Sequence, residues 1–292
     1  MKKLFPVFLM AAVLSCFSKK DKVGEVIESQ ALVNARNNFL GQMRNAKDWA
    51  AEIQSTGADF NEALLSDPSN YTQFLGDTLK SAAVLGVYLS DLNYCVMYGK
   101  GELSRNQFNS AIELSKQLGV DNNVLVFLMS RYYENISQSD SLMNVINELF
   151  AQSTDALKDR KKERLLGVTI AGYQIESLHL ALGIISKYPK ELMPLDMRIR
   201  ALTPLFEMVL RQQKTIEIIH AFLRALRNAS DPNRTPNFSF YDQAFYELLE
   251  VYKRQKVQEV LANDRSVELL NDDMINELRD KVSAIRDEIV GF

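Results

Sequence analysis

Cysteine, glycine and proline are scarce in this sequence, and each shortage narrows what the chain can be. Its 292 residues include 2 cysteines, 12 glycines and 7 prolines. Two cysteines cannot build a disulfide framework, and few glycines and prolines leave long segments without a break. An excess of one charge is also absent, because 34 lysines and arginines face 37 acidic residues. Without a basic field, nucleic acid is not an expected partner.

Common catalytic signatures are absent as well. The sequence contains no Gly-rich phosphate loop, no Gly-x-Ser-x-Gly elbow, no Cys-x-x-Cys pair and no His-Glu-x-x-His. Each of these patterns places reactive groups at a spacing that its chemistry requires. Their absence favours a non-enzymatic protein without a cofactor.

The first residues have the pattern of an export signal. Lys2 and Lys3 precede an apolar run over 4–14, which is too short to span a bilayer but suits the core of a signal peptide. The run ends in Val13-Leu14-Ser15-Cys16, which resembles a lipobox, the motif whose cysteine accepts diacylglycerol. We therefore expect a signal peptide over 1–15 and lipidation of Cys16. An ordinary signal peptide, or an N-terminal helix with an incidental cysteine, is the alternative.

The residues after Cys16 bear on where the protein is held. Acyl chains on Cys16 would anchor it to a membrane, and we find no second apolar run of spanning length. Phe17 stands where many inner-membrane lipoproteins carry aspartate, and 18–22 lacks the acidic cluster associated with surface export. These features predict an exported, lipid-anchored protein on the periplasmic face of the outer membrane. Residues 16–22 would form a short tether to a single helical domain over 23–292.

The rest of the chain predicts an all-α fold, a multi-helix bundle. Apolar residues recur at spacings of three and four, and no alternating β-branched run has turn signals on both sides. Helices are expected at Val23–Ile53, Tyr71–Tyr98, Ser104–Leu118, Asn122–Tyr133, Ser141–Leu157, Lys162–Lys187, Met197–Arg227, Tyr241–Ala262 and Asp272–Val290.

Two of these helices, over 71–98 and 162–187, are apolar on nearly every face. Such helices belong at the centre of a bundle. They align weakly, Gly86-x-x-Leu89-x-x-Leu92 against Gly172-x-x-Ile175-x-x-Leu178. The alignment is compatible with a weak internal duplication, although helical core patterns also imitate one another.

The same two segments carry a resemblance. The stretches Gly86-Val87-Tyr88-Leu89-Ser90-Asp91-Leu92-Asn93-Tyr94 and Ala171-Gly172-Tyr173-Gln174-Ile175-Glu176-Ser177-Leu178 resemble segments of uncharacterised all-helical lipoproteins of Bacteroidetes. The likeness extends over most of the chain after Cys16, but it consists of helix-core patterns. It implies a helical lipoprotein and no particular activity.

Polar residues inside the two apolar helices form the main candidate site. A buried carboxylate without a partner is costly, so Asp91 and Glu176 should be paired, protonated or facing a wet pocket. We expect a polar seam between the helices, formed by Tyr88, Asp91, Tyr94, Tyr173, Glu176 and His179. The alternative is a set of structural hydrogen bonds, with glycines that allow close helix packing.

Both histidines lie in Glu-x-x-His motifs, Glu176 to His179 and Glu217 to His220. This spacing puts an acid and an imidazole on one helical face, as in di-iron carboxylate bundles. The motifs lie on consecutive helices, however, without the intervening glutamate helix of that fold. A metal-dependent redox or hydrolytic enzyme, with iron or another transition metal, is therefore an alternative that requires the two histidines to converge.

The leading hypothesis is a membrane-tethered, non-enzymatic protein that binds an envelope protein or a small ligand. With Cys16 acylated, Cys95 is the only thiol left, and its neighbours suggest an ordinary buried cysteine. A sizeable groove in the structure would support ligand binding, and a fully convex surface would count against it.

Overall fold

The computed structural model describes residue 34 and residues 53–157, 162–188, 194–228, 238–270 and 272–291. Within these ranges every regular element is a helix and none is a strand. The prediction of an all-α multi-helix bundle is thus confirmed. The signal peptide, Cys16 and almost all of the helix expected at Val23–Ile53 lie outside the described residues.

The first half of the described chain contains two short 3-10 helices and four α-helices. They are η2 (Glu62–Leu64), η3 (Pro68–Phe74), α3 (Thr78–Met97), α4 (Gly101–Gln117), α5 (Asn122–Glu134) and α6 (Ser139–Ala156). The helix expected to begin at Tyr71 begins only at Thr78, because the Asp77 carboxylate accepts hydrogen bonds from the Leu79 and Lys80 N–H groups and caps α3. Asp121 caps α5 in the same way.

The second half contains α7 (Glu163–Lys187), α8 (Leu195–Asn228), α9 (Phe238–Arg254), α10 (Val257–Ala262), η5 (Ser266–Leu269) and α11 (Asp272–Val290). The single helix expected at Tyr241–Ala262 is wrong, since it is divided into α9 and α10. Lys256, between them, has a φ of 50°, which is left-handed backbone that no α-helix can continue through.

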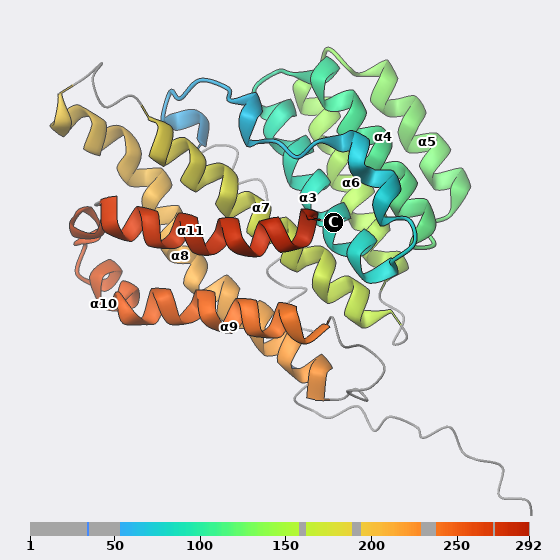
Figure 1. Cartoon of the computed structure of the whole chain (residues 1–292). Helices are drawn as coiled ribbons and strands as arrows, with labels where there is room; N and C mark the ends of the chain where they lie inside the picture. Colours follow the sequence, from blue (N-terminus) through green and yellow to red (C-terminus); the bar gives the residue numbers. More distant parts are fainter. Residues whose placement is uncertain are drawn as a thin grey trace, which may run out of the picture.

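The two apolar helices, α3 and α7, lie side by side at the centre of the described structure (Figure 1). On one side α4 and α6 pack against α3, and α5 packs outside α6. On the other side α8 and α11 pack against α7, and α9 packs against α8. The contact between α3 and α7 therefore joins the two groups of helices.

Helix α7 is long and apolar enough to cross a membrane by composition, contrary to our reading that no second run reaches spanning length. Its most apolar window of 18 residues has a mean hydropathy of 1.3, and 94% of that window is buried inside the bundle. A helix at the centre of a folded domain is also long and apolar, because the surrounding helices cover its apolar faces.

Candidate functional site

The backbones of α3 and α7 come into direct contact at two glycines. A Cβ atom on Gly86 would lie 1.9 Å from the carbonyl oxygen of Thr169, and one on Gly172 would lie 2.0 Å from that of Ala83. No side chain fits at such separations. The aligned glycines thus mark the point where α3 and α7 cross. Each glycine faces the carbonyl of the residue three positions before the glycine of the other helix.

One turn beyond this crossing, two acidic side chains lie fully buried. Asp91 on α3 and Glu176 on α7 each have a relative exposure of 0%. Their carboxyl groups are close enough to interact electrostatically. Beside them the hydroxyl groups of Ser90 and Ser177 form a hydrogen bond of 2.9 Å. Of the residues expected in the polar seam, Asp91 and Glu176 lie at this level.

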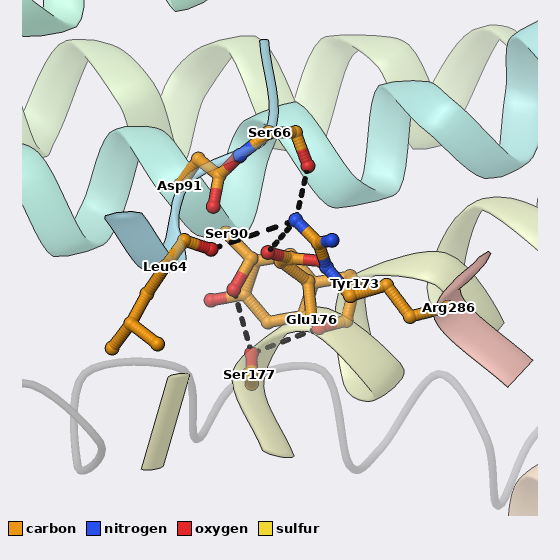
Figure 2. Close-up of polar contacts among 8 residues, drawn as sticks. All are labelled: Leu64, Ser66, Ser90, Asp91, Tyr173, Glu176, Ser177 and Arg286. Carbon is orange, nitrogen blue, oxygen red and sulfur yellow. Dashed lines mark hydrogen bonds and ion pairs between the residues drawn. The ribbon is translucent and has the colours of Figure 1, made fainter. Parts of the chain in front are cut away.

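A third helix supplies the positive charge of the cluster. The Arg286 guanidinium of α11 donates from Nε to Glu176 Oε2 at 2.6 Å and from Nη2 to Glu176 Oε1 at 3.1 Å (Figure 2). Nη2 also donates to the Ser66 hydroxyl at 2.6 Å. The Ser66 backbone N–H in turn donates to Asp91 Oδ2 at 3.0 Å. The sequence did not predict that Ser66 and Arg286 contact Asp91 and Glu176.

The electrostatics of this cluster favour a neutral Asp91. Burial, followed by the nearby Glu176 charge, raises the pKa of Asp91 well above its usual value, although Arg286 and the Ser66 N–H act in the opposite direction. Among the described residues, no N–H or O–H group donates a hydrogen bond to Asp91 Oδ1. With a proton on Asp91, the cluster holds one negative and one positive charge.

Two of the tyrosines expected in the seam bond to another segment, while Tyr173 bridges α7 to α3. Tyr88 donates from its hydroxyl to the Asp67 carbonyl at 3.1 Å, and the Tyr94 hydroxyl accepts from the Asn61 N–H at 3.0 Å. Both therefore hold the segment over 58–71 against α3. On α7, the Tyr173 hydroxyl accepts from the Asn93 side-chain amide at 2.9 Å.

His179 lies at the edge of the cluster. Burial lowers its pKa, while the neighbouring Glu176 charge opposes this shift. Cys95 is fully buried as a free thiol, and burial raises its pKa, which removes nucleophilic character at neutral pH.

The four residues of the metal hypothesis are not brought together. Glu176 is occupied by Arg286, and Glu217 accepts from the Gln213 side-chain amide at 3.0 Å. His220 Nε2 lies 3.4 Å from Asp242 Oδ1, in the contact between α8 and α9. Within the ranges that the structure describes, no three His, Cys, Asp or Glu side chains are grouped so that they could hold a metal ion.

A hollow of about 630 Å³ opens between α4 and the chain segment over 62–71. We call it the α4 hollow; its walls include Glu62, Asp67, Tyr71, Leu103, Asn106 and Gln107. Ser66 also lines it, so the α4 hollow adjoins the buried acid cluster. A second hollow of about 520 Å³ lies between α9 and α11, but its Arg227 and Lys281 are already paired with Asp242 and Glu247.

Comparison with known proteins adds no relative. No family model matches the chain, and searches of curated proteins and of solved structures found no match either. The candidate function therefore depends on the residues of this chain alone.

Proposed function

We propose that this protein is a lipid-anchored binding protein of the cell envelope, held at the periplasmic face of the outer membrane by acylated Cys16. The motif Val13-Leu14-Ser15-Cys16 after an apolar run supports the anchor. The α4 hollow supports the binding role and is the single observation that carries it. Its volume falls in the range of roughly 300–1,000 Å³ typical of small-molecule sites.

A structural role for the buried acids supports a non-enzymatic function. Asp91 and Glu176 are fully buried, Arg286 donates to Glu176, and the Ser66 N–H donates to Asp91 Oδ2. A general acid or base must reach the substrate directly or through one water molecule. The buried carboxyl groups of Asp91 and Glu176 instead join α3, α7 and α11.

Acylation is tested by growing cells that express the full chain with an alkyne-tagged fatty acid. We expect the label on the protein, its loss in Cys16→Ser, and its retention in Cys95→Ser, the matched control at the other cysteine. Label in Cys16→Ser, or none in the natural sequence, contradicts the anchor. Fractionation of the same cells then separates inner-membrane from outer-membrane attachment.

Ligand binding is tested by native mass spectrometry of the full-length protein released gently from envelopes. Asn106 is exposed on the wall of the α4 hollow, so Asn106→Trp should fill the hollow without disturbing the core. Glu113→Trp is the control, because Glu113 is exposed on α4 outside the hollow. A bound mass lost only in Asn106→Trp supports the proposal, and equal occupancy in both variants contradicts the site.

A further inference from the structure

A segment of chain over 58–71, which we call the strap, lies against the buried acid cluster with few attachments of its own. Its regular structure is limited to η2 and the first part of η3. All of its residues are described, and only the Leu64 and Ser66 side chains are buried. A segment held by so few buried side chains can open without unfolding the helices behind it.

Both buried side chains of the strap lie at the cluster. Leu64 packs on α7 where a glycine leaves room for it, since a Cβ atom on Gly183 would lie 2.5 Å from Leu64 Cδ2. The Ser66 N–H donates to Asp91 Oδ2 on α3, and the Ser66 hydroxyl accepts from Arg286 on α11 (Figure 2). The Leu64 carbonyl also accepts from Arg286, at 3.5 Å. The strap is therefore attached directly to the buried charges.

The strap is also one wall of the α4 hollow. Its residues Glu62, Leu65, Ser66, Asp67 and Tyr71 line the hollow, and residues of α4 form the other side. Ser66 thus lines the hollow and contacts the acid cluster, so a movement of the strap changes both. Glu62 and Asp67 are exposed, and water screens their charges from the cluster.

One proton decides the net charge behind the strap. Among the described residues, the charged groups that act on Asp91 are Glu176 on α7 and Arg286 on α11, and Asp287 adjoins Arg286. Ionised Asp91 would leave two buried anions beside one cation. Burial, followed by the Glu176 charge, therefore raises the pKa of Asp91 while the strap is closed, and water admitted by an open strap returns it towards 3.8. Rising pH then favours the open strap, because the open form binds fewer protons.

The other titratable groups near Asp91 either stay neutral or act in the opposite direction. Burial raises the pKa of Tyr88, Tyr94 and Cys95, which lie on α3 with Asp91, so these groups carry no charge at neutral pH. Burial lowers the pKa of His179 on α7 below 6.5. Falling pH would therefore favour an open strap through His179, and rising pH through Asp91. The direction of the pH dependence tells the two groups apart.

We propose that the strap is a pH-sensitive gate of the α4 hollow: loss of the Asp91 proton opens the strap, which removes one wall of the hollow and releases its occupant. Ser66 couples the two events, because it bonds to Asp91 and lines the hollow. The effect on an occupant depends on the proposed binding function and adds the regulation of that site. The opening of the strap itself requires no ligand.

The test is amide hydrogen exchange of the full-length protein in detergent micelles without ligand. Each observed rate is divided by the intrinsic rate at the same pH, which gives the equilibrium constant for opening. In His179→Gln, which removes the second titrating group, we expect the opening constant of the strap to rise at least about tenfold between about pH 5 and about pH 8. With Asp91→Asn added, it should stay within about twofold. The natural protein and Asp91→Asn, compared above pH 6.5, form a second pair.

A substitution of Ser66 tests the attachment itself. Ser66→Ala removes the hydroxyl that accepts from Arg286 and keeps the N–H that donates to Asp91. We expect it to raise the opening constant of the strap at least about tenfold at every pH, because a bond to a charged donor is lost. Ser69→Ala is the matched control, since Ser69 is exposed on the same strap, and it should change the constant by less than about threefold.

Three results would overturn the gate. They are a strap whose opening does not change with pH in His179→Gln, an equal change after Asp91→Asn is added, and a loss of protection in the centre of α7 together with the strap, which would be unfolding of the whole bundle. Failure of the binding function is separate, because these experiments contain no ligand. A strap that opens as expected, with no bound mass found by mass spectrometry, overturns the binding role and keeps the gate.

Discussion

Arg286 and Glu176 are 110 positions apart in the chain and meet through two hydrogen bonds inside the bundle. The Glu176 side chain is fully buried and that of Arg286 is 12% exposed, so both charges have left most of the solvent. Removing one partner would leave the other charge buried without compensation. The pair therefore fastens α11 to the central helix α7.

Replacement of Arg286 should destabilise the protein strongly. We expect Arg286→Met to lower the free energy of unfolding by about 3–5 kcal/mol, because Glu176 keeps its place without a cation. The measurement is chemical denaturation of the full-length protein. Arg279→Met is the control, since Arg279 lies on the same helix, is 40% exposed and pairs with Asp280; its cost should be below about 1 kcal/mol.

A second variant separates charge from packing. Glu176→Gln combined with Arg286→Met removes both charges, and the loss of stability should be smaller than for Arg286→Met alone. Equal losses in the two variants would assign the effect to the packing of Arg286 and not to its pairing.

The protonation of Asp91 predicts how stability changes with pH. The folded protein holds a proton on Asp91 above the usual pKa of 3.8, which the unfolded chain releases. The folded state then binds more protons, so this group's contribution to stability is fully present below pH 3.8 and declines as pH rises towards the higher folded pKa. The decline is at most about 1.4 kcal/mol per pH unit.

Asp91→Asn should remove this decline, because asparagine imitates the protonated acid. We expect the variant to gain stability relative to the natural protein between pH 5 and about pH 7, measured by urea denaturation at both values. Asp140→Asn, at an exposed position of α6, is the matched control and should show no comparable gain. A stability difference that does not change with pH would show that Asp91 is ionised in the folded state.

The separation of the two Glu-x-x-His motifs predicts the metal content. The Arg286 cation beside Glu176 opposes a metal ion there, and His220 faces Asp242 and the ring of Tyr246. In protein purified without chelator, we expect neither His179→Ala nor His220→Ala to remove a stoichiometric transition metal, measured by plasma mass spectrometry. One equivalent of iron lost in both variants would contradict this geometry.

The sequence predicted which helices are central better than it predicted which residues contact them. Spacing of apolar residues identified α3 and α7 as the central pair, and the cost of burying charge marked Asp91 and Glu176. Arg286 was missed because it lies next to Ile285, in a helix whose apolar spacing of three and four indicates only packing. Periodicity indicates which face of a helix is buried, but not which residue of a distant helix meets it.

The α4 hollow was beyond prediction for a related reason. Gln107 lies among the buried residues of α4, a pattern that favours a satisfied core amide. In the structure, Gln107 Oε1 has no hydrogen-bond partner among the described residues. The position of the segment over 62–71 beside α4 depends on tertiary contacts, including those of Tyr88 and Ser110.

The crossing of α3 and α7 gives the last prediction. Gly86→Ala and Gly172→Ala each place a Cβ about 2 Å from a backbone carbonyl oxygen, which cannot move without shifting a whole helix. We expect each variant to lose at least about 3 kcal/mol of unfolding free energy, or to fail to fold. Gly76→Ala is the control, because nothing lies within 4 Å of the added Cβ there, and its stability should stay within about 0.5 kcal/mol of the natural protein. If all three variants unfold at the same denaturant concentration, the two helices do not cross at these glycines.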